Sequence, residues 1–249
     1  MKKVSKKNMI WLTIIGICIF LMYDMIFNYV NWQTANRSSA GIAPKVEDTD
    51  DAVVQVYTAR VYNWRGYFAV HPWVAVKKKG DDHYTVYQVT GWNMFYEKTA
   101  VYAHPDLPDR YWYGRKPQLL QSLIGEKAEI AIPKIEAAVK SYPYKTTYTL
   151  WPGPNSNTFV EHIIRNVPEL TIELPPTAIG KDYIGSKTFL VPTASGTGYK
   201  FSLWGILSFE IGKIEGIEIG LLGLNFGIDW NRPAIKLPLI GRIGVDAFK

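Results

Sequence analysis

Cysteine is almost absent from this sequence of 249 residues, and the only one, Cys18, lies in an apolar N-terminal segment. No disulfide can therefore form within the rest of the chain, and no thiol there can serve as a nucleophile or a metal ligand. With 47% hydrophobic and 20% charged residues, the chain is long and apolar enough to be held by a hydrophobic core.

Several signatures of catalytic sites are also missing. No H-x-x-x-H or H-E-x-x-H spacing occurs among the four histidines, which are His71, His83, His104 and His162. The G-x-S-x-G signature of serine hydrolases is absent, and the glycine-rich segment at 196–198 lacks the lysine of a phosphate loop. The sequence therefore predicts neither a metal site nor a cofactor.

Beyond the N-terminus, the chain has no large excess of charge of either sign. The formal net charge is +6, but four of the lysines stand at positions 2, 3, 6 and 7. Beyond residue 30, 24 Lys and Arg are interspersed with 21 Asp and Glu. A phosphate-binding surface needs clustered positive charge, so no nucleic-acid partner is expected.

What the sequence does contain is a long apolar run near its start. No charged residue occurs from Met9 to Tyr23, and Asp24 alone interrupts the run as far as Val30. About 20 such residues cross a bilayer core, and preceding lysines favour a cytoplasmic N-terminus. We therefore predict a basic cytoplasmic N-terminus at 1–8 and a transmembrane helix at 9–29, with the lipid bilayer as its partner.

A cleaved signal peptide is the alternative reading of this segment. The bulky residues from Phe27 to Trp32 do not provide the small-residue site that cleavage needs, which favours a retained anchor. A polar tether at 30–51 then leads to a single exported globular α+β domain at 52–249.

Three segments of this domain are rich in Val, Tyr, Phe and Trp and are separated by turns. We expect them to form an antiparallel meander of strands at 52–62, 67–77 and 83–89. Helical spacing at 117–142 predicts two helices divided by Pro133.

A further helix is predicted from Thr158 to about Asn166, where Thr158 and Glu161 have capping-box spacing. From 200 to 229 glycine recurs every three to seven residues, which predicts tight hairpins or an irregular β extension.

Two segments bear residues suited to covalent catalysis. The run from Tyr67 to Val76 places His71 in an apolar strand, and the run from Gly153 to Val160 places Ser156 at the start of a helix. Base and nucleophile are thus available. The second run resembles the Asn-Cys-Asn-x-Phe signature of permuted papain-like proteins, a class that includes NlpC-type peptidases and DeSI-type isopeptidases, with serine in place of cysteine.

This resemblance implies a permuted papain-like fold, with helices packed against an antiparallel sheet and a β-rich, glycine-containing C-terminal extension after the transmembrane helix. It implies that His71 is the general base and Ser156 the nucleophile, with Asn155, Asn157 and the helix N-terminus forming the oxyanion site. A hydroxyl needs a better-oriented base than a thiol does, and the sequence identifies no third residue for that role.

A broader resemblance, to a bacterial membrane-anchored family of unknown function, rests on three runs, 60–66, 151–159 and 178–182. Together with the predicted N-terminal helix, it implies a single-pass protein of the bacterial cytoplasmic membrane with an extracytoplasmic domain, and it brings no activity. Candidate cleft-lining residues, with core or loop positions as the alternative reading, are Trp73, Trp151, Lys181 and Asp182.

Three functions follow as expectations. The first is a hydrolase or acyltransferase that acts on an amide or ester bond of the cell envelope through the Ser/His pair. The second is a non-catalytic module that kept the cleft and binds an envelope peptide, glycan or lipid. The third is a structural membrane-associated protein whose glycine-rich C-terminal segment packs against lipid or a neighbour.

Overall fold

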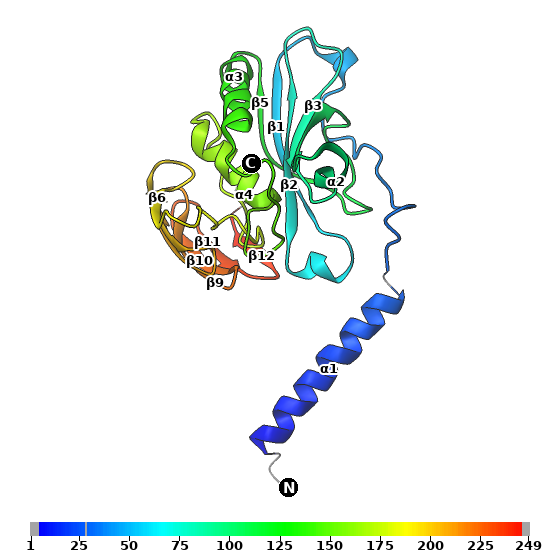
Figure 1. The fold of residues 1–249 in the computed structure, drawn as a ribbon, viewed down its shortest axis with the longest axis vertical. Helices are drawn as coiled ribbons and strands as arrows, with labels where there is room; N and C mark the ends of the chain where they lie inside the picture. Colours follow the sequence, from blue (N-terminus) through cyan, green and yellow to red (C-terminus); the bar gives the residue numbers. More distant parts are fainter. Residues whose placement is uncertain (1–4, 28, 246–249) are drawn as a thin grey trace.

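A computed structural model describes residues 5–27 and 29–245 of the chain. Across these residues it has four α-helices and two antiparallel sheets, one of five strands and one of seven. The two sheets form a globular body, from which helix α1 (Lys6–Phe27) projects (Figure 1). Residues 1–4 of the predicted basic N-terminus lie outside the described residues.

Sheet 1 has the order β4-β3-β2-β1-β5. Its first three strands confirm the predicted meander, because β1 pairs with β2 and β2 with β3, both antiparallel. The helix predicted at 117–124 is wrong, since a short apolar run fits a strand as well as a helix turn and here forms β5. The strands are β1 (Val53–Arg60), β2 (Val70–Lys77), β3 (Thr85–Val89), β4 (Val101–Pro105) and β5 (Gln118–Ile124).

Helices α3 (Glu126–Ser141) and α4 (Ser156–Asn166) cover one face of sheet 1. Alternation along β1 and β2 turns Val54, Val56, Val70 and Val74 toward them, into one core with Ile135, Phe159 and Ile163. Pro133 lies inside α3 and does not divide it, so that prediction is wrong. Burial of Ala128, Ile132 and Ile135 across the proline outweighs the lost hydrogen bond, a cost of about 3 kcal/mol.

The opposite face of sheet 1 carries a second core of aromatic side chains. Tyr57 and Trp73 stack at 5.6 Å, and Trp112 lies 6.1 Å from Trp73. The segments around residues 42–46 and 112–113 cover this face. Short helices in the connections are η1 (Val46–Asp48), η2 (Asn63–Tyr67) and α2 (Asn93–Glu97).

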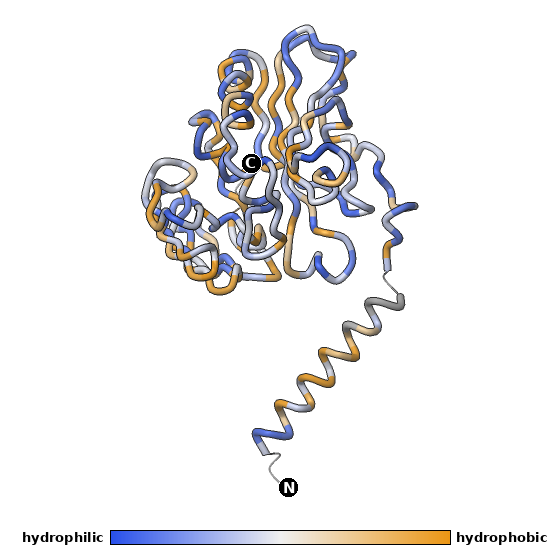
Figure 2. The backbone as a smooth tube through the Cα atoms, in the orientation of Figure 1, coloured by the Kyte–Doolittle hydropathy of each residue, from blue (hydrophilic) through white to orange (hydrophobic). Residues whose placement is uncertain are grey.

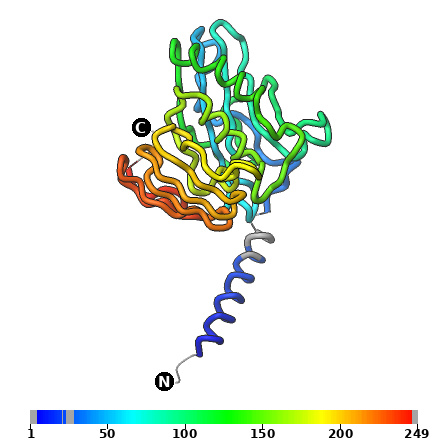
Figure 3. The backbone as a smooth tube through the Cα atoms, turned by 60° about the vertical axis from the view of Figure 1, so that its left-hand side comes forward, coloured from blue at the N-terminus to red at the C-terminus, as the bar shows by residue number. Residues whose placement is uncertain are grey.

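Sheet 2 contains the C-terminal strands, each hydrogen-bonded to the next along the chain. Figure 3 shows it as a curved layer, yellow to red, beside α4 at the end of the body from which α1 emerges. The predicted hairpins between 200 and 229 are confirmed as its central strands. The strands are β6 (Leu190–Pro192), β7 (Gly198–Leu203), β8 (Leu207–Gly212), β9 (Gly216–Leu221), β10 (Leu224–Asp229), β11 (Ala234–Leu237) and β12 (Gly241–Gly244).

Two predictions about the architecture are wrong. Of the helices formed by residues 5–27 and 29–245, none combines the length and the apolar character needed to cross a membrane. The transmembrane helix at 9–29, and single-pass anchoring with it, is therefore not supported. The predicted fold class, one papain-like α+β domain after such a helix, gives way to two antiparallel sheets with α4 between them.

Candidate functional site

The structure does not join the two predicted catalytic side chains. His71 faces the aromatic side of sheet 1, where its ring stacks on Trp112 at 3.7 Å and its Nε2 donates to Gln88 Oε1 at 2.8 Å. Ser156 begins α4, which packs on the other face. Among the described residues no hydrogen bond links them, and burial lowers the pKa of His71 to about 4.

The residues around Ser156 hold the start of α4 in place. The Asn155 side chain accepts from the backbone N–H groups of Asn157 and Thr158, and Thr158 Oγ1 accepts from Asn155 N. The capping box therefore pairs Asn155 with Thr158, and the predicted pairing of Thr158 with Glu161 is wrong. Asn157 Nδ2 donates to the carbonyls of Val70 and Ile179, so the backbone amides and side chains assigned to an oxyanion site make structural hydrogen bonds.

The four predicted cleft residues lie in different places. Trp73 is buried in the aromatic core and donates to Pro108 O at 2.7 Å. Trp151 is half-exposed and donates to Leu222 O at 3.0 Å. Lys181 and Asp182 are 3% and 2% exposed, beneath sheet 2. None of the four lines the cavity between β1 and β12.

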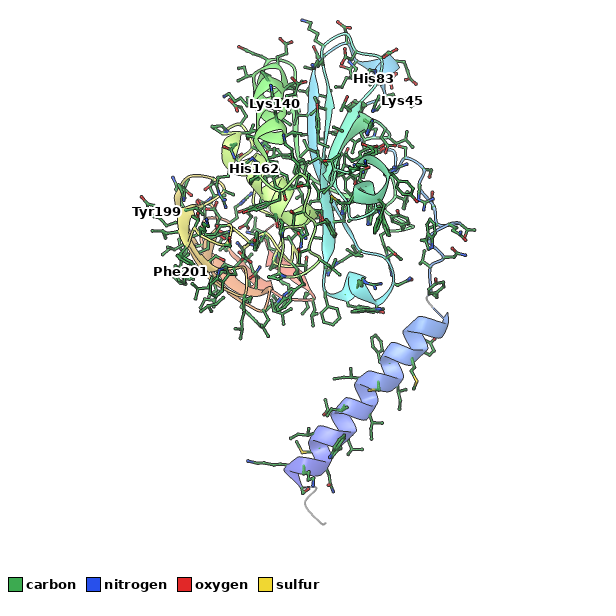
Figure 4. The ribbon with its side chains drawn as sticks, in the orientation of Figure 1. Lys45, His83, Lys140, His162, Tyr199 and Phe201 are labelled. Atoms are coloured by element: carbon green, nitrogen blue, oxygen red, sulfur yellow. The ribbon has the colours of Figure 1, made fainter. Side chains whose placement is uncertain are left out.

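Sheet 2 has its apolar side chains on the outside. Register pairing aligns three rows across its outward surface, which we call the outer face. The first row is Leu190, Phe201, Phe209, Ile219 and Phe226; the second is Pro192, Tyr199, Ile211, Ile217, Ile228, Ile235 and Ile243; the third is Leu203, Leu207, Leu221 and Leu224. In Figure 4, Tyr199 and Phe201 point away from the body.

The outer face is large as well as apolar. Twenty large apolar side chains between 189 and 245 are exposed, and Figure 2 colours much of this layer orange. If each presents about 80 Å², roughly half of what a large side chain buries, the patch covers on the order of 1,500 Å². Monomeric soluble proteins rarely expose a contiguous apolar patch of more than a few hundred Å².

Within residues 184–245, the only charged side chains that reach solvent are positive. Between 184 and 245 all four acidic side chains are buried, namely Glu210, Glu215, Glu218 and Asp229. Lys187 and Lys213 are exposed in the connections before β6 and between β8 and β9. Arg232 and Arg242, near β11 and β12, are partly exposed and ion-paired with Asp229. The outer face is thus apolar with a basic margin.

The charged side chains of sheet 2 point inward and form a buried ion network. Register pairing places Lys200, Glu210, Glu218, Lys236 and Arg242 in one row on the inner face, with Gly227 between Glu218 and Lys236. Their partners come from α4 and the segment that follows it, namely Glu161, Glu173, Lys181 and Asp182. Each ammonium group of the network contacts at least one carboxylate.

Lys200 is the centre of this network. Its Nζ lies 2.9 Å from Glu161 Oε1, 3.5 Å from Asp182 Oδ1 and 3.3 Å from Glu210 Oε2. Burial opposes the charge on Lys200, and the three carboxylates outweigh that effect and raise its pKa. Burial, with help from Glu161 and Glu218, raises the pKa of Glu210 to about 8 against the attraction of Lys200. An unpaired charge buried in this position would strongly destabilise the fold. Ion pairing within the network is what allows the inner face to carry charged side chains.

Glycines on the inner face leave room for these groups. A Cβ at Gly220 would stand 2.2 Å from Ser208 Oγ and 2.3 Å from Asn225 Oδ1. A Cβ at Gly212 would stand 2.3 Å from Glu215 Oε2. The glycine spacing in 200–229 is therefore a consequence of inward polar packing as well as of turns.

Three carboxylates in the network have the spacing of a metal site. Oxygens of Asp182, Glu210 and Glu218 lie within 4.8 Å of one another. Lys200 contacts two of these side chains, and Lys181 contacts Glu218. Since two ammonium groups already pair with these carboxylates, the trio belongs to the ion network and supports no metal assignment.

Comparison with known proteins gives a family and nothing more. A family model described as a protein of unknown function (DUF3750) matches residues 51–183, more than half of the chain, which therefore belongs to this family. The match covers sheet 1, α3, α4 and the segment after α4, and it ends before sheet 2. No curated protein and no solved structure matches.

Proposed function

We propose that this member of the DUF3750 family is a membrane-associated protein that rests the outer face of sheet 2 on an anionic lipid bilayer. One observation carries the proposal: the sheet turns aliphatic and aromatic side chains outward while its charged side chains are buried and paired. In water such a surface is unfavourable, and transfer into an apolar medium stabilises it.

The character of the face favours lipid over a protein partner. Its centre consists of Ile, Leu and Phe, and tryptophans stand in the turns at both ends of the strands, Trp204 after β7 and Trp230 after β10. Tryptophan favours the level of the lipid headgroups, where an apolar ring and a polar N–H are both accommodated.

The basic margin supplies charge complementarity with such a surface. Lysine and arginine near an anionic leaflet each contribute about 1 kcal/mol of attraction. All acidic side chains of 184–245 are buried, Glu215 against Ser195 and Thr197 and the other three in ion pairs. No exposed carboxylate in that range therefore opposes this attraction.

Helix α1 adds exposed apolar surface near the same end of the body. The ring of Phe20 meets Tyr67 of η2 at 5.6 Å, and the exposed side chains of α1 include Trp11 and Leu12. The lipid contact that the sequence predicts for the N-terminal segment is kept here as a contribution to surface binding.

Hydrolysis or acyl transfer by Ser156 and His71 stays a prediction that the arrangement of the two side chains does not favour. The same holds for binding of an envelope peptide or glycan in a papain-like cleft and for location at the bacterial cytoplasmic membrane. The outer face supports the membrane-associated alternative.

Quenching of tryptophan fluorescence by lipids with brominated acyl chains tests the proposal. The full chain is mixed with phosphatidylglycerol vesicles, and the expected result is quenching that falls in Trp204→Phe/Trp230→Phe. Trp73 is buried and provides the matched control. Trp73→Phe should leave unchanged the quenching that comes from Trp204 and Trp230.

Two results would count against bilayer docking. One is equal quenching of the wild type and the Trp204→Phe/Trp230→Phe variant. The other is a stable dimer in lipid-free solution that is lost when the outer face is made polar, which would identify a second copy of the chain as the occupant.

A further inference from the structure

A cavity opens where sheet 1 meets the last hairpin of sheet 2. It has a volume of about 230 Å³ and lies between the ends of β1 and β5, the segment 173–177, and β12. The cavity is therefore of the size of a small polar group and smaller than a typical drug-sized pocket.

Three cationic side chains line the cavity, namely Arg60, Lys116 and Arg242. Arg60 donates to the backbone carbonyls of Gly66, Tyr67 and Ile240. Among the described residues, no carboxylate lies within ion-pair distance of Arg60 or Lys116. Within residues 5–27 and 29–245, these two positive charges are held at the cavity without a counter-charge.

Further polar groups of the wall are consistent with an anionic guest. The Thr58 hydroxyl is buried and has no hydrogen-bond partner among the described residues. The one carboxylate in the lining, Glu173, is ion-paired with Lys236 and lies 3.9 Å from Arg242 Nε. Its negative charge is therefore already compensated.

The cavity adjoins the outer face of sheet 2. Ile240 and Val245 line it and are also 60% and 57% exposed, and Val245 follows Ile243 of the second apolar row by two residues. Arg60 Nη2 donates to Ile240 O at 2.9 Å, which ties the cationic wall to the β11–β12 hairpin of sheet 2. A ligand with an anionic head and an apolar tail would contact both surfaces at once.

We propose that this cavity binds the phosphodiester headgroup of an anionic phospholipid, whose acyl chains lie along the outer face of sheet 2. This assignment rests on the proposed membrane function and names the lipid class that the protein selects. Lys116 and Arg60 contact the phosphate, and the Thr58 hydroxyl donates to it or to the headgroup glycerol. Charge-assisted hydrogen bonds from a cavity wall are stronger than the long-range attraction of an exposed lysine.

Vesicle binding by the full chain tests the assignment. Affinity is measured for vesicles of phosphatidylcholine alone and for vesicles in which phosphatidylglycerol replaces part of it. Lys116→Gln is compared with Lys213→Gln, since both lysines are exposed and only Lys116 lines the cavity. Soluble glycerol phosphate is added as a competitor, and thermal denaturation in glycerol phosphate or inorganic phosphate reports binding without a membrane.

The expected result is a preference for phosphatidylglycerol that falls tenfold or more in Lys116→Gln and about fivefold or less in Lys213→Gln. Glycerol phosphate lowers the preference of the wild type and of Lys213→Gln and has no effect on Lys116→Gln. If both variants still bind vesicles and lose the preference for phosphatidylglycerol to the same extent, the headgroup site is overturned.

Two other outcomes are separable from these. Stabilisation by soluble phosphate that depends on Lys116, without any preference for phosphatidylglycerol, would assign the cavity to a free phosphate compound and overturn the lipid assignment. Failure to bind vesicles of either composition would overturn the proposed function itself, because the apolar outer face should contact lipid in both.

Discussion

Replacing Phe209 with serine removes one side chain from the middle of the outer face. Phe209 is 42% exposed and stands between Phe201 and Ile219 in the first apolar row. Of the 150–250 Å² that a large aromatic side chain can bury, roughly 80 Å² is therefore open to solvent. At about 25 cal/mol per Å², transfer of this area into lipid contributes about 2 kcal/mol. The affinity of Phe209→Ser for phosphatidylglycerol vesicles should accordingly be about 30-fold lower than that of the wild type.

Phe95 provides the matched control for this experiment. It is 87% exposed on α2, which packs beside sheet 1 and not in sheet 2. Phe95→Ser should leave vesicle affinity within twofold of the wild type, although it removes more exposed area. The assay is vesicle co-sedimentation, with circular dichroism to verify folding. Equal losses in the two variants would show that binding follows general hydrophobicity, and the reasoning from the outer face would be refuted.

The ion network and the predicted catalytic pair lead to three further predictions. Between about pH 4.5 and pH 8 the folded chain holds a proton on Glu210 that the unfolded chain has released, so stability falls as pH rises through this window. The free energy of unfolding in urea, measured against pH, should therefore fall less steeply for Glu210→Gln than for the wild type. An unchanged slope would contradict the proton assigned to Glu210. Lys200→Met leaves carboxylates buried without a partner and should cost about 3–5 kcal/mol in the free energy of unfolding, whereas Lys213→Met should change it by less than about 0.5 kcal/mol. A fluorophosphonate probe should not label the full chain; labelling that disappears in both Ser156→Ala and His71→Ala would restore the hydrolase prediction.

Part of the fold follows from local pattern. The runs that form β1, β2 and β3 are rich in Val, Tyr and Trp and are separated by polar turns, which is enough to predict an antiparallel meander. Residues 118–124 show the limit of this reasoning. Four apolar residues in seven fit about two turns of helix or a half-buried strand, and only pairing with β1 decides between them.

Local pattern could not predict that sheet 2 turns its apolar face outward, and the reason is physical. Alternation along β8 and β9 shows that the two faces differ, with Glu210 and Glu218 on one and Phe209 and Ile219 on the other. It does not show which face turns toward the body. That choice depends on Lys200 meeting Glu161 across a separation of 39 residues, and no local pattern reports such a contact.

The arrangement of the predicted site residues depends on tertiary contacts in the same way. His71 stands one residue from Val70 in β2, and that single step places its side chain on the face opposite α4. The motif around Ser156 correctly located the start of a helix. Its asparagines and Thr158 are explained by the capping of α4 and by hydrogen bonds to Val70, Ile179 and Gly180.

The depth of a spin label at Ile219 is the most direct test of bilayer docking. Because Cys18 is the only cysteine, a Cys18→Ser background allows one label at Ile219→Cys and, in a second protein, one at Phe95→Cys. With the protein on phosphatidylglycerol vesicles, we predict that the label at 219 becomes accessible to oxygen and shielded from a water-soluble nickel complex, while the label at 95 stays in water. If the label at 219 remains as accessible to nickel as the label at 95, the outer face does not contact lipid and the account is wrong.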